Sequence, residues 1–282
     1  MRDCVVYLGP NNWKERAIAL IEAVKRDYSV YQVSGRDLET LARLVDADRV
    51  AFAVTVGEHL PERRARLMLS ASGIQTIVLD LGYFDRAQSA SDVSGYNQAG
   101  WDRIGWIPDD APGDRWAALG LEILEPRPVK AHPERILALG QVEHDSQHGL
   151  DGEEIESWLY GASARLRFGG VGRTRAKMKL RPHPKQGWRP LQRWGVSTAL
   201  DKTLEEDLAW ADVVVTYNST AGLEAIRQGI PVLCSDRAFY AGVTMEEREK
   251  FFHRVAYAQW KMEELRDGTA LEFLMNDKDS HE

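Results

Sequence analysis

Short apolar runs alternate with helix-like patterns along the first part of the chain. The runs, together with one extended-looking stretch, predict strands at residues 5–8, 29–33, 50–56 and 76–79. Between them, apolar residues recur at helical spacing, which predicts helices at residues 13–26, 37–45 and 61–70. Strands that are apolar throughout and separated by helices are typical of a parallel sheet covered on both faces.

Between residues 82 and 128 this alternation breaks down, and it then resumes. The interrupted stretch is rich in Trp, Gly and Pro, which is typical of binding loops and linkers, and residues 125–130 resemble a linker into a second unit. Beyond it, the pattern predicts strands at residues 135–139, 176–180, 212–216 and 231–234. The accompanying helices are predicted at residues 153–165, 204–210 and 221–228, and two more begin near residues 245 and 262.

The sequence thus predicts two α/β domains, residues 1–128 and residues 129–282. Ligands of open α/β sheets bind outside the carboxyl ends of the strands, so two such domains are expected to face a cleft. Functional residues are therefore expected directly after strands.

Composition narrows the class of protein. The 282 residues are 44% hydrophobic and 28% charged, which excludes a disordered or fibrous chain. Cys4 and Cys234 are too far apart in sequence to suggest a disulfide or metal framework, which favours a reducing cytoplasm. The N-terminal apolar run is too short for a signal peptide, and no stretch is long enough to span a bilayer, so we expect a soluble protein without a membrane partner.

Charge is unevenly distributed. The net charge of −7 disfavours a general nucleic-acid binder. Residues 160–200, however, contain ten Lys or Arg and no Asp or Glu. Such a segment indicates a local anionic partner, either a phosphate group or a nucleic-acid backbone, or else a solvated charged surface.

The segment after the strand at residues 212–216 has the features of a phosphate site. Ser219 and Thr220 precede a predicted helix, whose N–H groups attract anions, and either hydroxyl is placed to bind a phosphate. Gly222 permits close approach, and Glu224 is one turn farther on, where a carboxylate can accept hydrogen bonds from ribose hydroxyls. The alternative is an ordinary capped helix with Glu224 in solvent.

Two further segments in this half also follow strands. His183 lies between two prolines that fix its backbone, and Arg181 and Lys185 flank it, so it is suited to donate a hydrogen bond to a phosphate oxygen; the alternative is a structural histidine. Gln141 follows the strand at residues 135–139 and either contacts the ligand or forms a turn.

In the first half, residues 80–86 follow a strand and contain two acids. An inverting transfer needs a general base that deprotonates the acceptor hydroxyl, and by position Asp80 and Asp85 both qualify. Asp85 can instead pair with Arg86 or cap a turn. The sequence lacks a Walker loop, a dinucleotide-binding glycine motif and a nucleophile elbow. A metal held by His144, Asp145 and His148 is the alternative to a site without metal.

Together these segments resemble the capsule-polysaccharide β-Kdo transferases, which are GT-B glycosyltransferases. The four matches in the second half are Gly140-Gln141-Val142-Glu143-His144-Asp145, Arg181-Pro182-His183-Pro184, Ser219-Thr220-Ala221-Gly222-Leu223-Glu224-Ala225 and Phe239-Tyr240-Ala241-Gly242. Residues 80–86 resemble an acidic element of the family that is thought to supply the base, but Leu81 stands where the family has an acid.

The resemblance implies a GT-B-like α/β fold with two Rossmann-type parallel-sheet domains, and an inverting enzyme that uses a nucleotide-sugar donor and needs no cofactor or metal. Residues 1–128 would then form the acceptor side and residues 129–282 the nucleotide-sugar side. Donor binding is predicted for Lys185, which follows the second motif, and for the motif residues Gln141, Arg181, His183, Ser219, Thr220, Gly222 and Glu224. Catalysis is assigned to Asp80 or Asp85 together with His183.

The tail of the chain, residues 256–268, is more similar to short phage-encoded relatives, which favours a hydroxymethylated base in phage-type DNA as acceptor and the host cytoplasm as location. Acceptor contacts are then predicted at Tyr83, Arg86, Arg173, Arg175 and Trp188, because cations track phosphates and aromatic rings stack on bases. A glycan acceptor and a non-catalytic sugar-nucleotide-binding module are the alternatives. The donor sugar and the oligomeric state stay open.

Overall fold

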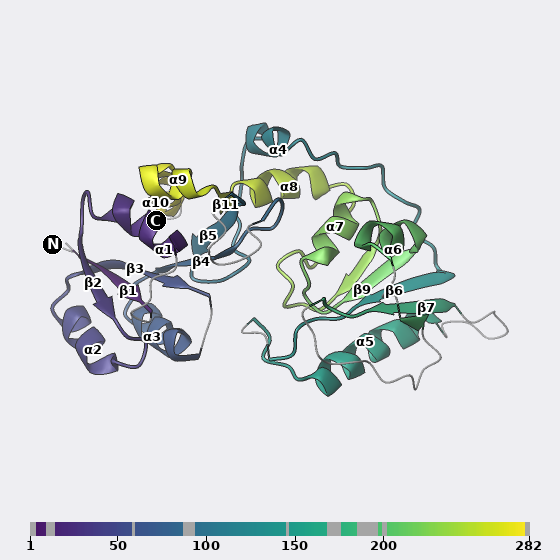
Figure 1. Cartoon of the computed structure of the whole chain (residues 1–282), viewed down its shortest axis with the longest axis horizontal. Coiled ribbons are helices and arrows are strands. Elements are labelled where there is room, and N and C mark those ends of the chain that lie inside the picture. The colour runs from purple at the N-terminus through teal and green to yellow at the C-terminus, as the bar shows by residue number, and fades with distance from the viewer. Residues whose placement is uncertain are drawn as a thin grey trace. The chain divides into compact units, whose positions relative to one another are not determined.

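The computed structural model describes residues 4–9, 15–57, 60–86, 94–144, 147–167, 176–184, 197–198 and 202–279. The chain forms two compact units (Figure 1). Unit 1 consists of Met1–Leu119 together with Phe252–Glu282, and unit 2 of Gly120–Phe251.

Unit 1 is built on a mixed sheet with the strand order β11-β5-β4-β3-β1-β2. Its strands are β1 (Cys4–Leu8), β2 (Ser29–Val33), β3 (Val50–Val56), β4 (Thr76–Leu81), β5 (Asn97–Trp101) and β11 (Gln259–Trp260). The first four are parallel, whereas β5 is antiparallel to β4 and β11 is antiparallel to β5. The carboxyl ends of β1, β3 and β4 therefore share one edge of the sheet.

Helices cover both faces of this sheet, as the apolar strands require. They are α1 (Glu15–Val24), α2 (Leu38–Asp46), α3 (Leu60–Ala71), α4 (Asp114–Leu119), α9 (Met262–Asp267) and α10 (Thr269–Asp279). Val5 and Tyr7 of β1 pack toward α1, α9 and α10, and Cys4, Val6 and Leu8 of the same strand pack toward α2 and α3. Because side chains alternate along β1, the strand contributes to two separate hydrophobic cores, one on each face of the sheet.

Unit 2 contains a parallel sheet with the order β10-β9-β6-β7-β8. Its strands are β6 (Arg135–Leu139), β7 (Lys177–Arg181), β8 (Ser197–Thr198), β9 (Val213–Thr216) and β10 (Val232–Cys234). Its helices are α5 (Gly152–Arg167), α6 (Leu204–Trp210) and α7 (Ala221–Arg227), while α8 (Arg248–Ala256) begins in unit 2 and ends in unit 1. Helix α5 covers one face of the sheet, and α6 and α7 cover the other.

The strands and helices predicted from apolar periodicity are confirmed, with shifts of a few residues at their ends. The prediction of an irregular stretch at residues 82–128 is wrong in part, because this stretch contains β5 and α4. Strand β5 begins with Asn97 and Gln98 and contains Gly100, so it has neither an apolar run nor clear alternation. Its pairing with β4 and β11 defines it as a strand, and a sequence pattern does not contain that information.

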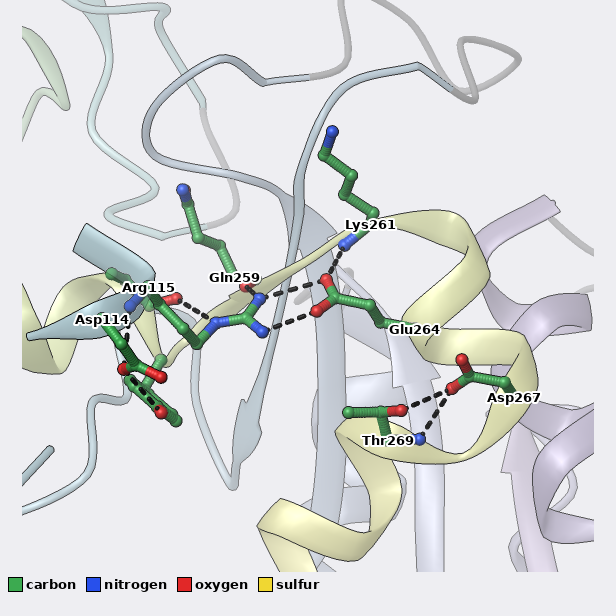
Figure 2. Close-up of polar contacts among 9 residues, drawn as sticks. Asp114, Arg115, Gln259, Lys261, Glu264, Asp267 and Thr269 are labelled. Atoms are coloured by element: carbon green, nitrogen blue, oxygen red, sulfur yellow. Dashed lines mark hydrogen bonds and ion pairs between the residues drawn. The ribbon is translucent and has the colours of Figure 1, made fainter. Parts of the chain in front are cut away.

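The C-terminal segment also differs from the prediction, which placed all of residues 129–282 in the second domain. Residues from Phe252 onward belong to unit 1, where β11 completes the sheet. Arg115 of α4 fastens this segment (Figure 2): its guanidinium donates to both carboxylate oxygens of Glu264, at 2.6 and 3.1 Å, and to the carbonyl oxygens of Ala256 and Gln259. It also lies 4.2 Å from the centre of the Trp260 ring.

Farther along the same segment, Asp267 receives hydrogen bonds from the backbone N–H of Thr269 at 2.9 Å and from its hydroxyl at 2.7 Å (Figure 2). These bonds satisfy an N–H group at the start of α10. Gly268, at φ +99°, makes the turn between α9 and α10.

The predicted linker is packed against unit 2. The N–H of Leu124 donates to the carbonyl of Arg227 at 2.9 Å, and that of Arg127 donates to the carbonyl of Gly229 at 2.8 Å. Gly229 has φ +71°, and a Cβ there would lie 2.2 Å from the carbonyl oxygen of Glu125. Glycine is thus required where this segment crosses the end of α7.

Candidate functional site

The motifs that lie far apart in the sequence of unit 2 meet at the carboxyl edge of its sheet. We call this group the motif cluster; it consists of Gly140, Gln141, Arg181, Pro182, His183, Asn218, Ser219, Thr220, Ala221, Gly222 and Tyr240. Each of its segments follows a strand, and in open α/β sheets this edge is where ligands bind.

Gly140 joins the first two motifs. Its N–H donates to the carbonyl of Arg181 at 2.8 Å. A Cβ at position 140 would lie 3.3 Å from the Cα of Pro182 and 3.6 Å from the backbone nitrogen of His183. The glycine therefore lets the chain after β6 pack against the turn that carries His183, whose side chain is half-buried.

Gln141 joins the first motif to the third. Its side-chain oxygen accepts a hydrogen bond from the backbone N–H of Asn218 at 2.9 Å, and its amide nitrogen donates to the side-chain oxygen of Asn218. Gln141 is buried, so its amide serves mainly to fix the loop after β9. Gln141 thus holds the loop after β9, and its contact with a donor stays a prediction.

Tyr240 joins the fourth motif to the third. Its phenol donates to the carbonyl oxygen of Ser219 at 2.6 Å, and the side chain is almost fully buried. A Cβ at Gly222 would lie 2.5 Å from the phenol oxygen. The Tyr240 phenol can therefore occupy this position because residue 222 has no side chain. Burial raises the pKa of Tyr240 well above its ordinary value, so the phenol stays protonated as a donor.

The start of α7 differs from the predicted phosphate site in how its N–H groups are used. The N–H of Gly222 donates to the carbonyl of Ser219 at 2.8 Å, and that of Ala221 approaches the Ser219 hydroxyl at 3.3 Å. Thr220 occupies the N-cap position with a helical backbone and without a side-chain capping bond. Since some of these groups already have acceptors in the protein, we expect the hydroxyls of Ser219 and Thr220 to contribute more to ligand binding than the backbone does.

Glu224 also has partners within the protein. Its carboxylate accepts hydrogen bonds from the Arg227 Nε at 3.1 and 3.2 Å and from the Gln228 amide at 3.1 Å. Burial raises the pKa of Glu224, but the hydrogen bonds from Arg227 and Gln228 outweigh it and hold the pKa below its ordinary value. The carboxylate is therefore charged at neutral pH, and a ribose would have to share it with Arg227.

Arg181 is held by an ion pair that the sequence does not reveal. Its Nη1 donates to the carboxylate of Asp207 at 2.7 Å and to the carbonyl of Lys202 at 2.7 Å. Asp207 is fully buried in α6, and Lys179 lies 3.7 Å from its other carboxylate oxygen. Two cations thus share one carboxylate, which leaves a net positive charge at this end of β7, and the donor contact of Arg181 stays a prediction. Lys185, Arg173, Arg175 and Trp188 lie outside the described residues.

In unit 1, Asp80 is the second-last residue of β4, near the edge where β1 and β3 also end. Its side chain is 28% exposed, its Oδ1 accepts a hydrogen bond from the N–H of Leu81 at 2.7 Å, and Arg16 of α1 lies 3.8 Å away. Asp80 is thus a partly exposed, fixed carboxylate at the ligand edge of the sheet.

Asp85 and Arg86 lie farther along the same loop, and both are exposed. Asp85 has a left-handed backbone, with φ +43°, and its carbonyl accepts the N–H of Tyr96 at 2.9 Å. Gly82 permits this tight loop, because a Cβ there would lie 2.6 Å from the carbonyl oxygen of Tyr96. The loop supports Asp85 through its backbone and leaves the side chain in solvent.

The predicted acceptor contact at Tyr83 is corrected by its burial, at 7% exposure. Its phenol donates to the side-chain oxygen of Gln98 at 2.8 Å, and its N–H donates to the side-chain oxygen of Gln259 at 2.9 Å. Burial, reinforced by the nearby Asp80 carboxylate, raises the pKa of Tyr83 far above its ordinary value. Tyr83 therefore holds the loop after β4 in place.

Sequence reasoning missed Arg16, Asn218 and Tyr240 as functional candidates. Tyr240 lies inside the fourth quoted motif and Asn218 directly precedes the third, so the signal lay in or beside the motifs. Arg16 lies beside Ala17 on the helix face that is otherwise apolar, and an arginine on a buried face is a signal in its own right.

Within the described part of the chain, no group of three His, Cys, Asp or Glu side chains is arranged to hold a metal ion. Asp145 of the alternative metal cluster lies outside it. No helix in the ranges that the structure describes has the length and apolar character needed to cross a membrane.

Comparisons with known proteins agree with this geometry. Residues 201–271 match the family model described as "Capsule polysaccharide biosynthesis protein". The structure superimposes on the β-Kdo 2,7 transferase of KpsC from Thermosulfurimonas dismutans with a TM-score of 0.58 and 18% identity, covering 96% of this chain and 99% of that one. The chain has a GT-B-like fold.

A second part of that protein, the β-Kdo 2,4 transferase of KpsC, gives a TM-score of 0.56 and 14% identity over 92% of this GT-B-like chain and 90% of the other. No curated protein matches by sequence. The resemblance to capsule-polysaccharide β-Kdo transferases that the motifs predict is confirmed by the family-model match and by these structures. The match to the family model includes α7 and the Ser219 and Tyr240 segments of the motif cluster.

Proposed function

We propose that this protein is a glycosyltransferase that moves a sugar from a nucleotide-sugar donor to a hydroxyl group of a glycan, with inversion at the anomeric carbon and without a metal. The observation that carries the proposal is the motif cluster, in which four segments of a capsule-polysaccharide motif pattern converge at the ligand edge of one sheet. The similarity to the two KpsC transferase structures supports the same reaction class.

The donor is proposed to lie on unit 2. His183 and the hydroxyls of Ser219 and Thr220 would contact its phosphates, and Glu224 its ribose. At Gly222 a Cβ does not fit beside the Tyr240 phenol, and at Gly140 it would be in tight contact with the backbone of Pro182, so the loops of the cluster are closely packed. Hydrogen-bond donors in a fixed arrangement stabilise the charge that develops on the leaving nucleotide, because they need not reorganise during the reaction.

The base is proposed to be Asp80. Its carboxylate would take the proton of the acceptor hydroxyl; the oxygen would then attack the anomeric carbon, and the bond from that carbon to the donor phosphate would break. Asp80 is favoured over Asp85 because its carboxylate is partly buried and fixed, whereas Asp85 is exposed. A fixed base loses less entropy on reaching the transition state.

The acceptor is proposed to be a glycan because the matched family model describes capsule polysaccharide biosynthesis and both matched structures are named as β-Kdo transferases. The acceptor predicted from the sequence, a hydroxymethylated base in DNA, depends on the similarity of residues 256–268 to phage-encoded relatives and on the basic segment at residues 160–200, much of which lies outside the described residues. It stays a prediction that the same assay tests.

The experiment is a transfer assay with a panel of nucleotide sugars, CMP-β-Kdo among them, offered with oligosaccharide acceptors and with hydroxymethylated duplex DNA. Mass analysis of both acceptor types reports the product. A glycosylated oligosaccharide supports the proposal, and glycosylated nucleosides in its place favour the DNA acceptor. Nucleotide binding without transfer to either acceptor would favour a non-catalytic binding module.

A further inference from the structure

Arg16 is unusual among the described arginines of unit 1 because its guanidinium is buried next to the candidate base. Its side chain is 5% exposed, its Nη1 lies 3.8 Å from Oδ1 of Asp80, and its Nε has no hydrogen-bond partner among the described residues. A buried cation with incomplete partners is costly to the fold. The cost suggests that the charge serves the carboxylate beside it.

Asp80 is restrained from two sides. Its Oδ1 accepts the N–H of Leu81 at 2.7 Å and faces Arg16, which belongs to the helix that packs on the same sheet. In the neighbouring strand its register partner is Gln98, a neutral residue that receives the Tyr83 hydroxyl. Asp85, by contrast, stands on an exposed loop with a left-handed backbone.

We propose that Arg16 is a positioning residue for the transfer reaction: its buried guanidinium holds the Asp80 carboxylate in place, and this fixed position makes Asp80 rather than Asp85 the base. This inference rests on the proposed function. It adds a residue outside the motifs and a reason for the choice between the two acids.

Other charged and titratable groups among the described residues of this edge have interactions of their own. Tyr83, in the loop after β4, is neutral because its burial and the Asp80 charge both raise its pKa. The positive charge of Arg103, beyond β5, works to lower the pKa of Tyr83. On the other side, the negative charge of Glu62 at the start of α3 contributes to raising the pKa of Tyr7 of β1. Burial lowers the pKa of Arg16 and the Asp80 carboxylate opposes it, as expected for a charged pair in contact.

The test is a titration of the Asp80 carboxyl by carbon-13 NMR, with its resonance identified by its loss in Asp80→Asn. Arg16→Met removes the charge and suits an apolar site, Arg16→Gln is a second charge-removing variant, and Arg16→Lys keeps the charge. Without the charge, the titration midpoint of Asp80 should rise by about one pH unit, and Arg16→Lys should recover most of this change. The acidic limb of the kcat/KM profile should move by the same amount, with the donor KM unchanged.

Arg266→Gln is the matched control, since it removes an arginine from an exposed ion pair with Glu22 in the same unit. The inference is overturned if Arg16→Met and Arg16→Gln show the same Asp80 titration midpoint, and the same acidic limb of the kcat/KM profile, as Arg266→Gln. If the wild-type protein transfers no sugar although the Asp80 midpoint depends on Arg16, the proposed function fails while the Arg16–Asp80 coupling stands.

Discussion

The Tyr240 phenol donates a 2.6 Å hydrogen bond to the carbonyl oxygen of Ser219, and its oxygen occupies the space that a side chain at Gly222 would need. Two motifs that are separated in sequence are thus parts of one packed contact. The turn that carries Ser219 and Thr220 depends on a residue that need not touch the ligand.

Removing this hydrogen bond should weaken the binding of the nucleotide sugar more than it lowers the stability of the fold. Tyr240→Phe leaves the Ser219 carbonyl with the N–H of Gly222 and without the phenol, and we expect a loss of about 1 kcal/mol in the free energy of unfolding together with a higher KM for the nucleotide sugar. Gly222→Ala should cost more, about 2 kcal/mol, because its methyl group overlaps the phenol. Urea unfolding and donor titration measure both effects.

The double variant Gly222→Ala/Tyr240→Phe checks the mechanism. Its destabilisation should be smaller than the sum of the single effects, since deleting the phenol oxygen relieves part of the overlap. Tyr31→Phe, at an exposed tyrosine of β2, is the control and should change neither quantity. Strict additivity would show that the two residues do not act on one another.

Alanine substitutions at Gly229 and Gly73 distinguish the cost of backbone strain from the cost of steric overlap. Both have positive φ, +71° and +70°, but only at Gly229 would a Cβ meet backbone atoms, with Glu125 O at 2.2 Å. We expect Gly73→Ala to cost about 1 kcal/mol and Gly229→Ala about 3 kcal/mol or more. Equal losses in thermal unfolding would mean that residues 124–127 are not packed against unit 2.

Asp212 gives a prediction for acid stability. Burial raises its pKa, but hydrogen bonds from Arg135, Lys130 and the N–H of Glu134 outweigh this and lower the pKa to about 2. A carboxyl group with a depressed folded-state pKa stabilises the fold above its unfolded pKa, and this contribution is lost as the pH falls through the folded value.

The pH window therefore runs from the ordinary Asp value of 3.8 down to about 2. Across it, the wild-type protein should lose about 2 kcal/mol of stability that Asp212→Asn does not lose, because the variant lacks the titrating group. Asp27→Asn, at an exposed carboxyl, should follow the wild-type curve. Parallel curves for wild type and Asp212→Asn in denaturant unfolding between pH 2 and pH 5 would contradict the assignment.

Arg115 predicts how firmly the C-terminal segment is attached. Arg115→Lys loses the paired bonds to Glu264 and the stacking on Trp260, and we expect a loss of about 2 kcal/mol in the free energy of unfolding and faster proteolysis after residue 252. Arg266→Lys changes an exposed pair between α9 and Glu22 of α1 and should leave both measurements near wild type. Equal proteolysis of the two variants would show that Arg115 does not fasten the segment.

The strands and covering helices were predictable because their apolar runs directly record which faces are buried. Residues 213–216 and the helix that ends before Gly229 follow from such patterns and from the glycine that closes them. By contrast, β5 and β11 are strands because of the partners they pair with, and Asn97 and Gln259 give no apolar signal. The return of the C-terminal segment to unit 1 depends on Arg115 and Glu264, which are 149 positions apart.

The candidate site was predictable in its location and less so in its chemistry. Motifs placed Gln141, Arg181 and Glu224 at strand ends or helix starts, and the structure places them there. Their side chains are engaged by Asn218, Asp207 and Arg227, respectively, and such pairs form only in three dimensions. Burial likewise decides that Tyr83 supports the loop instead of meeting an acceptor.

The most direct test of the account is the rate of sugar transfer by Asp80→Asn compared with Asp85→Asn, measured with the donor and acceptor that the wild-type protein uses. Losing the general base should lower kcat by about a hundredfold or more in Asp80→Asn, with donor affinity retained, while Asp85→Asn stays within a few-fold of wild type. Equal rates for Asp80→Asn and wild type would contradict the account.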